Sequence, residues 1–391
     1  MIPKGFLFSA VEAAIKKPGR RDLALIYSQQ EATMAGTFTT NRVKAAPVRL
    51  DMRRIKTGRG QAIIVNSGNA NACTGDVGMR DAREMARLVA HDLKLSPSLV
   101  YVCSTGVIGT PMPMGRLRSG LSEVTAGLGA CSINDVAAAI MTTDTYPKIA
   151  SRTLKVNGGT GTLAGICKGA GMICPRMATM LCFLMTDIAV DRKALDTALR
   201  HAVVRSFHRI TVDGDMSTND TVLIMANGML GNRPVTEKSR AYGAFRDALD
   251  DITFELSKMI VKDGEGATKL IEVEVRGARN EAEAEKAAFS VAKSNLVKTA
   301  MYGNDANWGR IMAALGYSGI SFSEERVDIS FGKVPVVRDG VSNGRDADAE
   351  KVLREKEVRI TIDLKRGRSS ARVLTCDLTE EYIRVNATYR T

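Results

Sequence analysis

The chain has 391 residues, a length typical of two or three domains or one large one. Hydrophobic residues make up 45% and charged residues 25%, which is ordinary for a globular protein with ample core. The formal charge is +12, but aromatic residues are only 5% and acidic residues alternate with many of the basic ones. This pattern favours a surface that attracts small anions over one that binds nucleic acid.

Neither the start of the chain nor its apolar runs predict a membrane location. Residues 1–5 show no apolar signal segment, and the apolar run at 177–185 is too short to cross a bilayer. Seven scattered cysteines form no CxxC pair, which argues against a disulfide framework and against a zinc site. We therefore expect a cytoplasmic protein without a metal or cofactor. Three histidines leave a Ser-His-Asp triad open, although no GxSxG elbow supports one.

The first third of the chain predicts strands that end in small and amide residues. Residues 22–47 alternate in the way of paired strands, and Gln61–Val65 leads into the segment NSGNANA. After a helix predicted over 79–93, a strand predicted over Val100–Cys103 is followed directly by the segment STGVIG. Glycine at 106 allows close approach of a backbone N–H to a ligand, as in an oxyanion hole. An ordinary strand-to-helix turn explains the same residues.

The stretch from Lys168 to Val190 carries the sharpest chemical hypothesis. A hairpin over 152–166 precedes it, and it leads through glycines and a proline to Ala178-Thr179. A threonine hydroxyl is a weak nucleophile unless a base takes its proton, and a free α-amine on the same residue is one such base. The amine exists only if the chain is cut before Thr179. The alternative is that 177–185 is simply a buried strand.

The second half of the chain alternates between helices and strands. Helices are predicted over 242–262 and, as one element, over 282–299, and the final residues from Tyr382 alternate like a strand packed inward. Three aspartates at 213–220 suit either a cation or, more simply, hydrogen bonds to nearby backbone. Since no repeat or linker interrupts this alternation, we predict a layered α/β architecture.

Eight motifs in order resemble the ornithine acetyltransferase (glutamate N-acetyltransferase) family of arginine biosynthesis over essentially the whole chain. They are NSGNANACTG at 66–75, STGVIG at 104–109, TTDTYPK at 142–148, KGAGMICPRMATML at 168–181, RITVDGD at 209–215, GEGATK at 264–269, NWGRI at 307–311 and the closing NATYRT. The resemblance implies a helix–sheet–sheet–helix sandwich with a smaller α/β subdomain from about residue 280.

The resemblance also implies roles for particular residues. Self-cleavage between Ala178 and Thr179 would give associated chains 1–178 and 179–391, expected as a heterotetramer of two copies of each. Thr179 would take an acetyl group from N-acetylornithine and pass it to glutamate. Thr105 and Gly106 match the family's oxyanion hole, and its substrate contacts match Thr145, Lys168, Thr179, Glu265, Asn386 and Thr391.

Two alternatives remain open from the sequence. A hydrolase of related fold with an N-terminal nucleophile, an aminopeptidase, would release the acyl group to water. Acetyl-CoA is a further candidate acetyl donor, and no nucleotide-binding loop decides its use. Arg176 and Cys174 depart from the expected pattern on the leaving side of the junction, where they would alter the rate of cleavage more than acetyl transfer.

Overall fold

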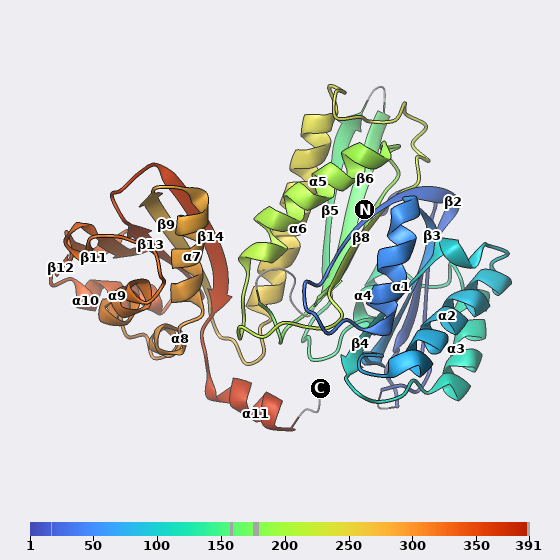
Figure 1. Ribbon diagram of the computed structural model, residues 1–391, viewed down its shortest axis with the longest axis horizontal. Coiled ribbons are helices and arrows are strands. Elements are labelled where there is room, and N and C mark those ends of the chain that lie inside the picture. Colours follow the sequence, from blue (N-terminus) through green and yellow to red (C-terminus); the bar gives the residue numbers. More distant parts are fainter. Residues whose placement is uncertain (17, 157–158, 175–179, 389–391) are drawn as a thin grey trace. The chain divides into compact units, whose positions relative to one another are not determined.

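A computed structural model describes the chain except residues 17, 157–158, 175–179 and 389–391. It divides into two compact units (Figure 1). Among the described residues, the first unit contains Met1–His208 and Asp215–Ile260, and the second contains Arg209–Gly214 and residues 261–388. Within the described ranges, no helix is both long and apolar enough to cross a membrane.

The first unit is built on one eight-stranded sheet with the order β4-β3-β2-β8-β7-β6-β5, to which β1 is added beside β2. Its strands are β1 (Phe6–Val11), β2 (Leu23–Phe38), β3 (Arg59–Asn69), β4 (Val100–Val107), β5 (Lys148–Val156), β6 (Gly159–Lys168), β7 (Leu181–Thr186) and β8 (Thr221–Ala226). Its helices are α1 (Ala46–Arg54), α2 (Gly75–Asp92), α3 (Met114–Ala126), α4 (Ile133–Ala139), α5 (Arg192–Arg205) and α6 (Tyr242–Lys262), the last of which runs into the second unit.

The long strand β2 belongs to both halves of this sheet. Its first part pairs with β1 and β3, its second part pairs with β8, and the register with β3 shifts between Tyr27 and Ala32. One core cluster joins Ile63 of β3 to Ile166 of β6 and Phe183 of β7. The two halves therefore pack face to face, as in a sheet–sheet sandwich.

Helices cover the outer faces of the two halves. Alternate residues of β2, such as Leu23 and Leu25, turn away from the inner cluster and pack with α2 and α3. On the other half, a Cβ at Gly165 of β6 would contact Leu256 and Ile252 of α6. This arrangement confirms the predicted helix–sheet–sheet–helix sandwich.

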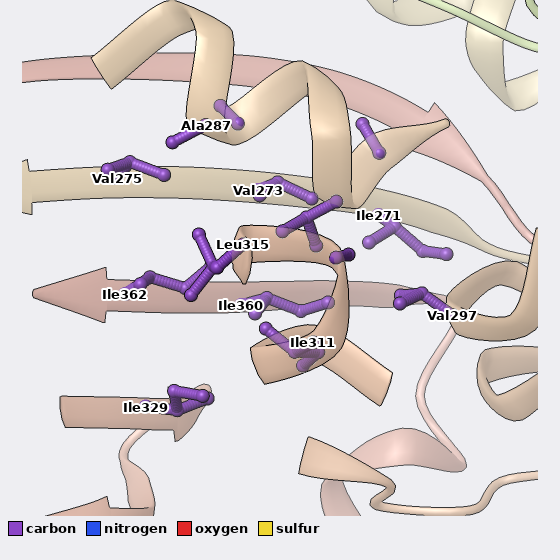
Figure 2. Close-up of a cluster of buried hydrophobic side chains, with 14 of the residues drawn as sticks. Ile271, Val273, Val275, Ala287, Val297, Ile311, Leu315, Ile329, Ile360 and Ile362 are labelled. Carbon is purple, nitrogen blue, oxygen red and sulfur yellow. The ribbon is translucent and has the colours of Figure 1, made fainter. Parts of the chain in front are cut away.

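The second unit has its own six-stranded sheet, in the order β12-β11-β10-β13-β9-β14, and its own core (Figure 2). Only the β13–β9 pair is parallel. The strands are β9 (Leu270–Ala278), β10 (Asp328–Phe331), β11 (Val334–Arg338), β12 (Val341–Ser342), β13 (Glu357–Asp363) and β14 (Ser369–Cys376), and the helices are α7 (Glu281–Ala292), α8 (Asn295–Tyr302), α9 (Trp308–Gly316), α10 (Asp346–Leu353) and α11 (Glu380–Thr388).

Two predictions in this unit were wrong. The helix predicted over 282–299 is interrupted after Ala292, because Ser294 starts α8 by accepting a hydrogen bond from Val297 N at 3.3 Å. The C-terminal residues form the helix α11 and not a strand, and none of its described side chains is buried. Glu380 and Glu381 lie in its first turn, where negative charge favours a helix. Ile383, expected to pack inward, is 65% exposed.

Candidate active site

The residues predicted to form an oxyanion hole lie where two parallel strands of the first unit end, a place that we call the oxyanion corner. β3 and β4 pair so that Ser67 lies opposite Thr105 and Gly68 opposite Gly106. Gly106 has φ +132°, and a Cβ there would lie 2.3 Å from the carbonyl carbon of Gly68. Only glycine fits at this position, because any side chain would collide with the neighbouring backbone. The segments NSGNANACTG and STGVIG therefore meet at one point.

Buried amide side chains fix the shape of this corner. Asn66 accepts a hydrogen bond from Ser104 Oγ at 2.6 Å and donates to Asn69 O at 2.9 Å. Asn219 donates from its side chain to the carbonyls of Ser104 and Ala70, both at 2.7 Å. Because these groups are buried and paired, the backbone on both sides of Gly106 is held in one conformation.

A buried lysine reaches the corner from β6. The Lys168 ammonium donates to Thr142 Oγ1 at 2.7 Å, lies 3.5 Å from Thr105 Oγ1, and is 3.8 Å from Asp144 Oδ2. Its side chain is only 2% exposed. The structure thus brings together two of the predicted residues, Lys168 and Thr105, and places a positive charge beside the predicted oxyanion hole.

Asp144 holds this lysine and a second one. Its carboxylate accepts hydrogen bonds from Lys148 Nζ at 2.7 Å and from Gly169 N at 2.6 Å. Burial acts to raise the pKa of Asp144, but the charges of Lys168 and Lys148 and the bonds from Lys148 and Gly169 outweigh it and lower that pKa to about 2. Asp144 is therefore ionised at neutral pH and compensates two buried cations.

A second buried carboxyl group lies next to the start of β7. Asp220 Oδ1 accepts a hydrogen bond from Met180 N at 3.0 Å, a backbone group 40 residues away and not the nearby backbone that the sequence predicted. Burial raises the pKa of Asp220 to about 8, although the Met180 N–H and the charge of Lys168 act to lower it. Asp220 fixes the backbone of the residue that follows Thr179 in the chain.

Lys16 approaches the corner from the N-terminal segment. Its ammonium donates to Met141 O at 2.6 Å and to Ala139 O at 3.0 Å, and its Cγ would lie 3.0 Å from a Cβ at Gly68. Burial lowers the pKa of Lys16 to about 8; the charge of Lys168 acts in the same direction and that of Asp22 opposes it. A lysine from the N-terminal segment thus lies beside the candidate site.

In the second unit, two motifs far apart in the sequence are tied together. Asn386 Nδ2 in α11 donates to Glu265 Oε2 at 2.8 Å, and Thr379 Oγ1 donates to Gly266 O at 2.7 Å. Gly266 has φ +69°, and a Cβ there would lie 2.5 Å from Tyr382 N. The GEGATK loop and the C-terminal helix therefore form one structure that presents Glu265 and Asn386 together.

The remaining predicted site residues are not brought into the oxyanion corner by the described part of the structure. Thr145 is exposed, directly after the buried Asp144. Ala178, Thr179 and Thr391 lie outside the described residues, so their roles stay predictions. No role for Asp144, Lys148 or Lys16 was predicted from the sequence, and Asp220 was predicted only as part of a polar loop. Asp144 and Lys148 lie inside the TTDTYPK motif, which was the one signal that pointed to them.

Comparisons with known proteins identify the family of the chain. The model of the ArgJ family matches residues 7–391. The arginine biosynthesis bifunctional protein ArgJ of Geobacter sulfurreducens is 56% identical over 390 residues, 99% of both chains. The protein of the same name from Symbiobacterium thermophilum is 52% identical over 392 residues, covering 100% of this chain and 98% of the relative.

A solved structure supports the fold. The crystal structure of the arginine biosynthesis bifunctional protein ArgJ from Bacillus halodurans matches with a TM-score of 0.52 and 44% identity, over 53% of this chain and 98% of that chain. Together these matches define an acyltransferase of arginine biosynthesis. The chain belongs to the ArgJ family, which confirms the resemblance found in its motifs.

Replacing Asp144 with asparagine is predicted to destabilise the first unit. Two buried ammonium groups would lose their counter-charge, which costs about 3–5 kcal/mol of unfolding free energy. The pKa of Asp144 is depressed, so its contribution is present above pH 4 and lost as the pH falls through about 2. Urea titration at pH 7 measures the loss. As a control, Asp348→Asn removes an exposed partner of Arg345 and Lys351 and should change the free energy of unfolding far less. Equal losses in both variants would contradict the assignment.

Asp220→Asn tests the second carboxyl group through pH. The pKa of Asp220 is raised from 3.8 to about 8, so above pH 4 the unfolded chain loses this proton while the folded chain keeps it. Folding is therefore disfavoured progressively between pH 4 and 8. Asparagine keeps an acceptor for Met180 N, and the variant should gain stability over wild type by up to about 1.4 kcal/mol per pH unit in this window. A stability difference that does not grow with pH would show that Asp220 ionises normally.

Proposed function

We propose that this protein moves an acetyl group from N2-acetylornithine to glutamate through an acetyl ester of Thr179, as a glutamate N-acetyltransferase. The observation that carries the proposal is the meeting of Gly106, Thr105 and buried Lys168 in one polar corner. β6 ends at Lys168, and the chain that follows leads within eleven residues to Thr179.

Cleavage before Thr179 comes first in the proposed mechanism. It frees an α-amine whose ordinary pKa of about 7.7–8.0 leaves part of it unprotonated near neutral pH. The length of the crystallised Bacillus halodurans chain supports the cut. It is almost fully matched by 53% of this chain, so it is about half as long as the relatives of about 390 residues. Cleavage after residue 178 would leave chains of 178 and 213 residues from the 391.

Acetyl transfer then takes two steps. The amine accepts the Thr179 hydroxyl proton, the oxygen attacks the acetyl carbonyl, and the amide bond breaks so that ornithine leaves with the proton. The amine of glutamate next attacks the acetyl ester, which releases N-acetylglutamate and the free hydroxyl. Each step passes through an oxyanion, for which Gly106 N–H and Thr105 are the proposed donors. Losing one such donor costs about 10²–10³ in rate in other enzymes.

The other predicted residues are assigned to the substrates. Lys168 carries the charge for their α-carboxylate, and its position 3.5 Å from Thr105 Oγ1 also adds positive potential beside the oxyanion. Glu265 is assigned to a cationic group of the substrate, and its bond to Asn386 supports a joint role for the two. Thr145 and Thr391 complete the proposed set of contacts.

Three further properties belong to the proposal. The relatives are named bifunctional proteins, which supports acetyl-CoA as a second acetyl donor, with no other cofactor proposed. The two cleavage chains are proposed to remain together as a heterotetramer with two copies of each. A cytoplasmic location is in keeping with the seven cysteines, all of which are free thiols in the described chain.

Intact-mass spectrometry tests the cleavage directly. Wild type should appear as two chains that separate under denaturing conditions, and Thr179→Ala as one chain, because alanine has no hydroxyl to attack the preceding peptide bond. Thr179→Ser is the matched control and should still give two chains. A single chain in fully active wild type would refute the role of the α-amine.

The main rival is an aminopeptidase-type hydrolase on the same fold. It differs in the acceptor of the acetyl group, since transfer requires that water be kept from the acetyl ester. We expect ornithine release from N-acetylornithine to depend on added glutamate over many turnovers and N-acetylglutamate to form in equal amount. Sustained ornithine release with free acetate and no glutamate would establish the hydrolase instead.

A further inference from the structure

A strongly basic pocket of about 410 Å³ lies in the first unit, lined by residues of α1 and α2. These two helices are in contact and appear side by side in Figure 1. It has no part in the acetyl-transfer corner described above. Helix α1 lines it with Arg49 and Arg53, and α2 with Arg80 and Arg83. The full lining is Lys44, Ala46, Arg49, Arg53, Cys73, Thr74, Gly75, Asp76, Met79, Arg80 and Arg83.

The cationic side chains of this pocket outnumber the acidic groups next to them. Five of its side chains are cationic and one, Asp76, is acidic. Arg53, Arg80 and Arg83 form no hydrogen bond or ion pair with any described residue. On the same helix, Glu84 is already bonded to Arg118 at 2.7 Å. Cations gathered around one hollow repel each other, and a bound anion would remove that repulsion.

Backbone N–H groups at the start of α2 are further hydrogen-bond donors beside the pocket. Thr74 and Gly75, at the start of α2, belong to the pocket wall. The Thr74 hydroxyl donates to Asn71 Oδ1 at 2.6 Å and does not cap the helix, so the first N–H groups of α2 have no partner within it. Gly75 has φ +59°, and the space where its Cβ would stand is open.

We propose that this pocket binds a small molecule that carries a diphosphate ester. Arginine presents paired N–H groups that match two phosphate oxygens, and a helix start favours the same ligand. One carboxylate would leave most of five cations uncompensated, whereas a diphosphate balances several. The volume falls within the range of small-ligand sites, about 300–1,000 Å³.

Two sources share this chemistry, coenzyme A and a free nucleoside diphosphate. The pocket adjoins the end of the NSGNANACTG segment, whose Gly68 lies at the oxyanion corner. Gly68 and Gly75 are seven residues apart, at most about 25 Å of extended chain. Coenzyme A has a long flexible arm between its diphosphate and its thioester, so its diphosphate site need not touch the corner. This source rests on the proposed use of acetyl-CoA, whereas the binding of a diphosphate does not.

Cys73 supplies a direct readout of occupancy. It lines the pocket and is the one exposed cysteine among the seven, all of which the structure describes. Alkylation of Cys73 by iodoacetamide, followed by mass spectrometry, should slow when inorganic pyrophosphate, ADP or coenzyme A is added, and not when ornithine is added. Cys73→Ser identifies the reacting thiol.

Charge-matched variants separate specific binding from general attraction. The double change Arg53→Gln with Arg80→Gln should weaken protection by pyrophosphate at least about tenfold, as expected for the loss of charged hydrogen bonds. Arg205→Gln with Arg233→Gln removes the same charge from exposed positions outside the pocket and should leave protection unchanged. Protection that is absent for all three diphosphate compounds, or equal in both double variants, would overturn the proposal.

Kinetics distinguish the two sources. If coenzyme A is the ligand, the pocket variant should raise the KM for acetyl-CoA about tenfold and leave exchange between N-acetylornithine and glutamate unchanged. If a free nucleotide is the ligand, ADP should still protect Cys73 in wild type while the KM for acetyl-CoA is the same in both double variants. If wild type catalyses no exchange between N-acetylornithine and glutamate, this result would count against the proposed acetyltransferase and not against this pocket.

Discussion

The candidate site depends on one buried carboxylate that holds two buried lysines. Asp144 binds Lys148 directly and lies 3.8 Å from Lys168, with all three side chains almost fully excluded from water. An uncompensated ammonium in such a place would lose its proton, and Lys168 could not then act as a cation. The ion cluster therefore serves two purposes at once: it fixes the end of β6, and it keeps a positive charge beside Thr105.

The rest of the first unit is arranged around that charge. The sandwich brings the ends of β3 and β4 to the same point, where Gly106 allows backbone contact that no other residue would permit. Asp220 accepts a hydrogen bond from the backbone N–H of Met180 and so orients the chain that follows Thr179. Asp220, whose pKa is raised, and Asp144, which is ionised at neutral pH, give the site two acidic groups with different proton affinities. The basic pocket at α2 is lined by the last residues of the NSGNANACTG segment.

Sequence patterns predicted the parts of this protein that depend on local rules. The buried strands and the layered fold followed from alternation and glycine placement, whereas the joint placement of Thr105 and Lys168 in one site followed from the family resemblance. The roles of Lys16, Asp144 and Lys148 did not, because nothing local marks which charged residues become buried. α11 was misjudged because the alternation of Tyr382, Ile383 and Val385 suits a strand as well, and the acidic first turn of the helix was overlooked. The break at Ser294, by contrast, had a local signal in its own capping side chain.

The central claim is that Thr179 carries the acetyl group between substrates, and trapping that group tests it most directly. The enzyme should be mixed with N-acetylornithine labelled in its acetyl group, without glutamate, quenched in acid, and digested for peptide mass spectrometry. The account predicts one labelled acetyl group on the hydroxyl of Thr179 at the start of its chain, removed when glutamate is added before the quench. Turnover with no labelled Thr179, or with the label on Cys182 or another residue, would contradict it.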